Sequence, residues 1–278
     1  MRVLRIIPVF VVALFMLGGL PLGGAQPNQL DKGIMIDGDV LLGNLPRPSF
    51  TELSANRFTL VGLGVLNYYN ESQLEKFVPL IQELHDMDMR VFTMLYSNYT
   101  TTLKYAELAA QLGFDVIEID EPFAHSFTEN QIVSVVENVT AMYPQVRFII
   151  TDWSLPHLIT LYALTAEMRN VDIAVDNYDS LQYVQWNSDL ARKYGKQPYT
   201  WLMFIGNRHS SRNLQAWLNA TQATNSNLLL FLIDAAQKWQ SQWSLLSPAT
   251  PIPEIPTSII PITVMALLLT LVVRKKDS

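Results

Sequence analysis

Short apolar runs alternate with amphipathic stretches between residues 31 and 246 of this 278-residue chain. Apolar runs of about four to eight residues predict buried strands, and apolar positions that recur every three or four residues predict helices. The predicted strands are 34–37, 58–66, 90–97, 114–120, 147–152, 171–176, 199–206 and 227–233. The predicted helices follow them at 49–57, 71–87, 101–112, 128–143, 155–169, 180–194, 210–224 and 236–246. This alternation indicates a parallel sheet covered by helices.

Two of the predicted helices have a clear apolar face. In the first it comprises Leu74, Phe77, Val78, Ile81 and Leu84, and in the second Ile132, Val135, Val136 and Val139. Pairs typical of a capping box precede both faces, Asn70 with Gln73 and Thr128 with Gln131. Pro144 ends the second helix.

Eight strand–helix repeats in about 215 residues predict an α/β fold, a closed (β/α)8 TIM-type barrel. A doubly wound open sheet is the alternative. No Gly-x-Gly-x-x-Gly follows a predicted strand, so nothing indicates a dinucleotide site, and we expect no cofactor. The first repeat has the weakest pattern.

The amino-terminal segment, residues 1–25, has the pattern of a signal peptide. Arg2 and Arg5 precede an apolar run over 6–17, and a small-residue stretch ends at Ala25. A basic start, a short apolar run and a small-residue site are typical of secretion signals. An uncleaved signal anchor is the alternative.

The carboxyl-terminal segment predicts membrane anchoring. Residues 257–273 carry no charge and are long enough for a transmembrane helix, and residues 274–278 form a basic tail that favours the cytoplasmic side. Residues 247–256 contain four prolines and predict an extended stalk. We therefore expect a barrel domain, residues 26–246, held outside the membrane at the cell surface.

The tail also contains a short motif, Pro253-Glu254-Ile255-Pro256, before the apolar span and the basic cluster. This order resembles the carboxyl-terminal sorting signals of prokaryotic, notably archaeal, surface proteins. One class of these signals has Phe where this chain has Ile255. The resemblance implies a sorting enzyme as a partner that acts on the tail.

Composition narrows the classes of partner. The chain has no cysteine, which excludes disulfides and thiol chemistry. Asn-x-Ser/Thr sequons at Asn70, Asn98, Asn138 and Asn219 predict glycosylation of an exported surface. Without the five basic residues and one acidic residue of the two ends, 14 Lys or Arg face 24 Asp or Glu. A net charge near −10 argues against nucleic acid as a partner.

The candidate chemistry lies at the carboxyl ends of the predicted strands, where TIM barrels place their reactive groups. Five of these strands end in acids, which are Asp37 and Asp39, Glu118, Asp120 and Glu121, Asp152, Asp176, and Asp234. Buried carboxylates are costly unless they are paired or functional. The pattern therefore predicts a negatively charged mouth.

The sharpest stretch runs from Val116 to Glu121. Strand alternation sends Glu118 and Asp120 into the barrel, and Glu121 begins the following loop. Neighbouring carboxylates raise one another's pKa, which keeps one protonated as a general acid, and glycoside hydrolysis needs a second, ionised carboxylate opposite. Asp152 or Asp176 is expected to supply it. Helix capping by the same acids is the alternative.

An apolar strand that ends in Asp120-Glu121, within a small exported barrel, resembles the spherulin-4-like glycoside hydrolases and, more loosely, the polygalactosaminidase-like barrels. The resemblance implies catalysis by Asp120, Glu121 and a later acid, with Asp176 at the matching position where relatives often have Glu. It also implies aminosugar polysaccharides as substrates.

Further side chains at the strand ends are expected to bind a polysaccharide or other glycan. Aromatic rings stack on the apolar faces of sugars, and polar groups bind hydroxyls. The expected substrate-binding residues are Glu118, Tyr96, Trp153, Tyr178, Asn207, Arg208, Asp37 and Asp234. We expect no metal site. The sequence thus predicts a surface-anchored glycoside hydrolase, with a non-catalytic glycan-binding or cell-envelope barrel as the alternative.

Overall fold

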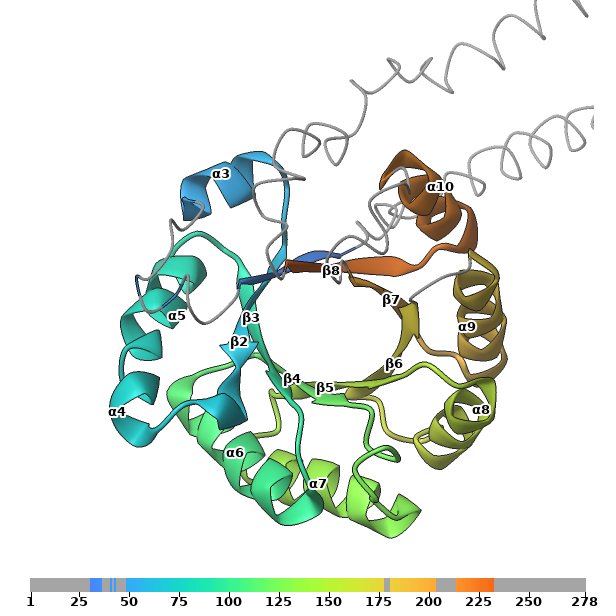
Figure 1. The fold of residues 1–278 in the computed structure, drawn as a ribbon, viewed down its shortest axis with the longest axis horizontal. Coiled ribbons are helices and arrows are strands. Elements are labelled where there is room, and N and C mark those ends of the chain that lie inside the picture. The colour runs from blue at the N-terminus through green and yellow to red at the C-terminus, as the bar shows by residue number, and fades with distance from the viewer. Residues whose placement is uncertain are drawn as a thin grey trace, which may run out of the picture. The chain divides into compact units, whose positions relative to one another are not determined.

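The computed structural model describes residues 31–36, 41, 43, 49–177, 181–203 and 214–232. Within this part, strands form a central ring and helices surround it (Figure 1). The strands are β1 (Lys32–Ile36), β2 (Leu60–Val65), β3 (Arg90–Leu95), β4 (Val116–Asp120), β5 (Arg147–Asp152), β6 (Val171–Asn177), β7 (Pro198–Met203) and β8 (Asn227–Leu232).

The helices lie between the strands in the chain. They are α3 (Phe50–Ala55), α4 (Glu71–Leu74), α5 (Phe77–His85), α6 (Tyr99–Leu112), α7 (Glu129–Met142), α8 (Leu155–Leu164), α9 (Leu181–Tyr194) and α10 (Leu214–Thr224), with the 3-10 helix η1 (Leu66–Tyr68) after β2.

The sheet is closed. Each strand pairs in parallel with the next, and β1 also pairs with β8, for example Gly33 with Leu229. The predicted (β/α)8 barrel is therefore confirmed, and the open doubly wound sheet is excluded. Closure brings the ends of all eight strands to two common rims.

Two apolar clusters stabilise the barrel. The larger one lies between the strands and the helices and includes Ile117 and Ile119 of β4. The smaller one fills the inside and includes Val116, Phe92 and Trp201. Successive residues of β4 thus alternate between the two clusters, as the period of two requires.

The predicted helix 71–87 is divided into α4 and α5. Pro79 has no backbone N–H and would interrupt a continuous helix, whereas a helix restarting at Phe77 places it in the first turn, where no such bond is needed. The apolar face is correspondingly altered, because Val78 is 48% exposed while Phe77, Ile81 and Leu84 are buried.

Both predicted capping boxes are present. The Gln131 backbone N–H donates to Thr128 Oγ1 (3.3 Å), and the Thr128 N–H donates to Gln131 Oε1 (2.9 Å). Asn70 and Gln73 exchange the same two bonds before α4, at 3.0 and 3.1 Å. These bonds fix where the helices after β2 and β4 begin.

The four sequon asparagines have exposed side chains. Asn98 is also the N-cap of α6, because its Oδ1 accepts from the Thr101 N–H (3.1 Å). That bond uses the side-chain oxygen and leaves the nitrogen that would carry a glycan. Glycosylation stays a prediction.

The predicted signal peptide, stalk, membrane span and basic tail lie outside the described residues. Within the described part, no helix has the length and apolar character needed to cross a bilayer.

Candidate active site at the carboxyl end of the barrel

Strand β4 carries the two acids at the centre of the site. Glu118 and Asp120 occupy the inward positions that alternation predicts, and Glu118 lies one layer deeper than Asp120. Glu118 is fully buried, whereas Asp120 is partly exposed at the end of the strand. The barrel therefore encloses one acid and presents the other at its rim.

The Glu118 carboxyl group is held from two other strands. Its Oε1 accepts hydrogen bonds from the Thr151 hydroxyl on β5 and from the Trp201 indole N–H on β7. Its Oε2 has no hydrogen-bond partner although it is buried. One oxygen is thus fixed by the protein, and the other can hold a proton or meet a ligand.

Burial raises the pKa of Glu118 to about 8, and the nearby charge of Asp176 adds to this, while the two hydrogen bonds act in the opposite direction. Burial outweighs the bonds because a carboxylate removed from water loses more solvation than two donors replace. A pKa of about 8 favours the protonated form of Glu118 at neutral pH.

The other acids surround Asp120. Burial raises the pKa of Asp120 well above its usual range, and the charges of Glu118, Asp176, Glu121 and Asp152 raise it further, in that order. The structure thus brings together the five predicted acids of strands β4, β5 and β6. Their mutual repulsion favours proton uptake at the mouth.

Glu121 begins the loop after β4 with a left-handed backbone, φ 43°. Its N–H donates to the Thr151 carbonyl (2.9 Å), and its own carbonyl accepts from the Ala124 N–H (3.0 Å). A non-glycine residue in this region is uncommon and is often functional. The bonds to β5 and the loop hold this conformation in place.

Asp152 has a different environment from the one expected for a second catalytic carboxylate. It is buried, accepts from the Ser154 N–H (2.9 Å), and places both oxygens against His157 Nδ1 at 3.0 and 3.1 Å. These local contacts orient the His157 ring at the start of α8. Asp176, on β6, is the buried acid that faces Glu118.

His157 was not among the expected site residues. The sequence contains its signal, since Ser154 is the N-cap of α8 and accepts from the His157 N–H (3.3 Å), which puts His157 in the first turn beside the strand end. Its contacts with Asp152 and with the Phe123 ring, 4.6 Å away between centroids, distinguish it from a solvated histidine.

Three exposed aromatic side chains lie in the segments that follow β2, β3 and β5, namely Tyr68, Tyr96 and Trp153. Asn67 joins the first two segments, because it donates to the Tyr96 carbonyl (3.0 Å) and accepts from the Tyr96 N–H (2.9 Å). The Tyr96 ring stands perpendicular to His125 at 4.0 Å between centroids. The predicted aromatic positions Tyr96 and Trp153 thus belong to the same rim as the acids.

The remaining predicted residues, Asp37, Asp39, Tyr178, Asn207, Arg208 and Asp234, lie outside the described residues. Among the described residues, no group of His, Asp and Glu side chains could hold a metal ion.

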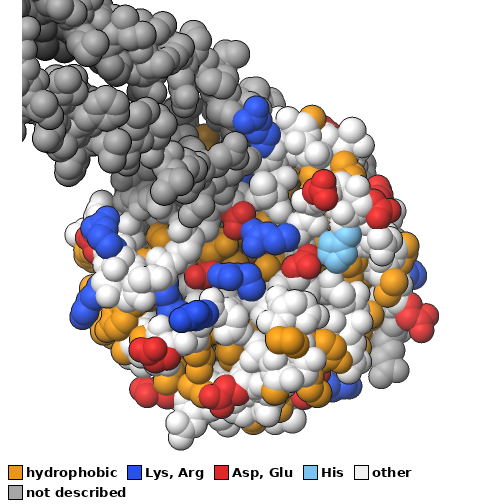
Figure 2. Space-filling view, turned by 180° about the vertical axis from the view of Figure 1, so that it is seen from behind, with side chains coloured by type: hydrophobic (Ala, Val, Ile, Leu, Met, Phe, Trp, Pro, Cys, Tyr) orange, Lys and Arg blue, Asp and Glu red, His pale blue; other side chains and the backbone are white. Residues whose placement is uncertain are grey.

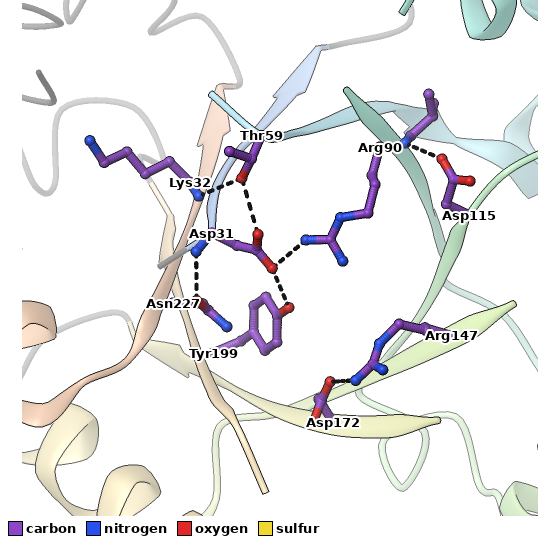
Figure 3. Close-up of polar contacts among 10 residues, drawn as sticks. Asp31, Lys32, Thr59, Arg90, Asp115, Arg147, Asp172, Tyr199 and Asn227 are labelled. Carbon is purple, nitrogen blue, oxygen red and sulfur yellow. Dashed lines mark hydrogen bonds and ion pairs between the residues drawn. The ribbon is translucent and has the colours of Figure 1, made fainter. Parts of the chain in front are cut away.

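At the opposite end of the barrel, where the strands begin, acidic and basic side chains form ion pairs. Arg90 contacts Asp31 and Arg147 contacts Asp172, and the Tyr199 hydroxyl donates to Asp31 Oδ2 (2.8 Å) (Figure 3). Seen from behind, basic and acidic side chains lie together near the centre of this face (Figure 2). Here Asp31 and Asp172 each have an arginine partner.

Comparison with known proteins shows which fold this chain has. No family model and no curated protein matches the chain. A putative dihydrodipicolinate synthetase from Pseudomonas aeruginosa superposes with a TM-score of 0.56, at 11% identity over 88% of this chain and 84% of the other. A monomeric dihydrodipicolinate synthase variant superposes with a TM-score of 0.54, at 14% identity over 81% of this chain and 76% of the other. An N-acetylneuraminate lyase from Fusobacterium nucleatum superposes with a TM-score of 0.50, at 10% identity over 78% of this chain and 79% of the other. The shared feature is the parallel barrel.

These comparisons correct the expected family. The similar structures are synthase and lyase barrels, so the resemblance to spherulin-4-like and polygalactosaminidase-like enzymes was wrong, and so was the glycoside hydrolase activity drawn from it. The error has a physical cause. Barrels of unrelated chemistry place acids at the carboxyl ends of their strands, so Asp120-Glu121 identifies the rim and not the reaction.

The expected cell-surface location is corrected with it. The prediction depended on residues 257–273, which lie outside the described part, and the described barrel resembles these synthases and lyases and has no membrane-spanning helix. Membrane anchoring therefore plays no part in the function proposed below.

Proposed function

We propose that this protein is a lyase-type enzyme that breaks or forms a carbon–carbon bond beside a carbonyl group, using the carboxyl groups of the barrel mouth to move protons. The observation that carries the proposal is Glu118, a fully enclosed acid with a pKa of about 8 and one oxygen without a partner. An acid that is protonated at neutral pH can give its proton to a reacting oxygen.

The cleavage of a β-hydroxy ketone illustrates the step. Asp176 takes the proton of the substrate hydroxyl, the carbon–carbon bond breaks, and an aldehyde forms. The electron pair of that bond moves onto the carbonyl as an enolate, and Glu118 transfers its proton to the enolate oxygen. The resulting enol becomes a ketone when its carbon takes the proton held by Asp176 and its oxygen returns its proton to Glu118, so both acids regain their starting states. Bond formation is the same sequence in reverse.

Proton transfer is favoured over covalent catalysis by lysine. A Schiff base with a carbonyl substrate requires a lysine amine at the reacting centre. The described lysines are Lys32, Lys76, Lys104, Lys193 and Lys196, and none of them lies at the carboxyl end of a strand. The carboxyl groups are thus the reactive groups that the described rim offers.

Exchange of hydrogen for deuterium at the carbon beside a carbonyl reports this chemistry without knowledge of the full substrate. The full-length protein is incubated in deuterated buffer with dihydroxyacetone, pyruvate or aminoacetone, and exchange is followed by NMR. We expect catalysed exchange with at least one of them, and a loss of about 100-fold or more in Glu118→Gln.

Glu137→Gln is the matched control, because Glu137 is exposed on α7, a helix that lies outside the ring of strands (Figure 1). It should retain the wild-type rate. Equal rates in Glu118→Gln and wild type, or no exchange above the buffer rate with any of the three compounds, would overturn the proposal.

A further inference from the structure

The two ends of the barrel differ in charge. Among the described residues, every Lys and Arg that borders a strand lies at its amino end, namely Lys32, Arg57, Arg90, Arg147, Arg169 and Lys196. The carboxyl end has Glu118, Asp120, Glu121, Asp152 and Asp176 instead. A ligand entering the described mouth therefore meets acidic side chains and no described Lys or Arg.

One carboxyl oxygen among these acids is available to a ligand. Glu118 Oε2 is buried without a hydrogen bond, Asp120 lies two residues further along the same strand, and Asp176 on β6 is close enough for its charge to act on both. Buried polar atoms nearly always have a partner, so Glu118 Oε2 marks a place where a ligand atom fits. An ammonium group beside Asp120 and Asp176 would offset the repulsion among the acids and would leave the proton of Glu118 for the substrate oxygen.

Aromatic side chains border the same acids. Burial raises the pKa of Tyr96, and the nearby charges of Glu121, Asp120 and Tyr68 raise it further. The Tyr96 hydroxyl therefore lies close to these acids. Tyr68 and Trp153 are the other exposed rings of this rim, at 65% and 49% exposure. Rings of this kind attract organic cations through their faces, most strongly when carboxylates lie nearby.

A metal ion fits this mouth less well than an organic cation. No group of described acids and histidines has the arrangement that a metal needs. Metal ions also gain little from exposed aromatic rings, whereas ammonium groups bind to both carboxylates and rings.

From these observations we propose that the mouth recognises a substrate bearing an organic ammonium group, held between the carboxylates of β4 and β6 and the rim aromatics Tyr96 and Trp153. This inference rests on the proposed function for the location of the substrate, and it adds the substrate's charge. Neutral and anionic carbonyl compounds would then be poorer ligands than their amino counterparts.

The test compares choline with its neutral carbon isostere, 3,3-dimethylbutan-1-ol, by isothermal titration and saturation-transfer NMR on the full-length protein. The two compounds have nearly the same shape and differ in charge. We expect saturable binding of choline, at least about tenfold weaker binding of the isostere, and a choline affinity that falls as salt is added.

Two variants locate the site. Asp176→Asn should weaken choline binding by about tenfold, and Tyr96→Leu, at an exposed rim position, should weaken it by several-fold. Glu137→Gln removes a charge of the same sign from the outer face and should leave binding unchanged. Equal affinities for choline and the isostere, or choline binding that none of the site variants alters, would overturn the inference.

The outcome is separable from that of the proposed function, because binding needs no turnover. Choline binding without any exchange activity sensitive to Glu118→Gln would retain the cation site and remove the lyase chemistry. Exchange sensitive to Glu118→Gln, with no preference for the ammonium compound, would do the reverse.

Discussion

Glu118 couples the stability of the fold to pH. The pKa of Glu118 is about 8 in the folded protein and near the ordinary value of 4.5 when the side chain is exposed, so between these pH values the folded state holds a proton that the unfolded state has released. The stabilisation from this proton is complete below about pH 4.5 and declines as the pH rises to about 8.

Glu118→Gln should therefore reduce the loss of stability between pH 5 and pH 8. The amide has the shape of the protonated acid and can still accept from Thr151 and Trp201 through its oxygen. Denaturant midpoints measured across this range should converge at low pH, and the variant should become the more stable protein near pH 8 and above. Parallel pH profiles for both proteins would show that Glu118 is ionised in the folded state at neutral pH.

Trp201 tunes the acidity of Glu118. Its indole N–H lowers the pKa of Glu118, so Trp201→Phe should raise that pKa and move the basic limb of the pH–rate profile upward. The variant also loses a buried hydrogen bond, at a cost of about 1–3 kcal/mol in unfolding free energy. An unmoved basic limb in a folded Trp201→Phe protein would show that Glu118 does not set the profile.

At this scale the sequence predicts some groups and not others. Strand alternation places Glu118 and Asp120 inside the barrel correctly, because that inference needs only neighbouring residues. The contact between Glu118 and Trp201 joins residues 83 apart and depends on how β4 and β7 face each other in the closed barrel. No local pattern contains this information, and the pairing of Asp152 with His157 depends on the turn at Ser154 that brings the start of α8 back to the end of β5.

Helix α7 shows how far local signals define an element. The predicted range 128–143 and the observed Glu129–Met142 agree within a residue at each end, because Thr128 and Gln131 fix the start and Pro144 fixes the end. The predicted helix 71–87 was wrong in its continuity, because Pro79 outweighs an apolar period that otherwise continues.

Thr128→Ala should destabilise the protein by about 1 kcal/mol, because the Gln131 N–H loses its acceptor at the start of α7. Thr51→Ala is the matched control, since Thr51 is exposed within α3 and should change the unfolding free energy by less than about 0.5 kcal/mol. Chemical denaturation of both variants measures the difference. Equal effects would mean that α7 is held by packing of Ile132 and Val135 alone.

At the scale of the whole barrel, the two rims divide the work of folding and function. The amino rim pairs its charges, whereas the carboxyl rim collects acids that repel one another. Such a group of like charges lowers the stability of the fold. Proteins retain destabilising groups of this kind where their activity requires them. The eight-strand alternation made the barrel predictable, but it could not identify the reaction, because every barrel of this kind has reactive side chains at the same rim.

Asp31 is the best test of this division. It contacts Thr59 Oγ1 (3.1 Å), Arg90 and the Tyr199 hydroxyl (2.8 Å), and its own N–H donates to Asn227 Oδ1 (2.7 Å). The residue thus joins the start of β1 to β2, β3, β7 and β8, close to where the first and last strands meet. We expect Asp31→Asn to cost about 1–2 kcal/mol of unfolding free energy, since Arg90 loses its charged partner at a partly exposed position.

The same substitution should leave catalysis alone, because Asp31 lies at the end opposite to Glu118. The exchange rate of Asp31→Asn should stay within about twofold of wild type at a temperature where both are folded. Asp189→Asn, which breaks an exposed pair with Arg192 on α9, is the control for loss of a surface ion pair and should change stability by less than about 0.5 kcal/mol. If Asp31→Asn instead lowered the exchange rate as strongly as Glu118→Gln without lowering the unfolding free energy, the amino rim would have to be part of the active site. The separation of a stabilising end from a reactive end would then be wrong for this barrel.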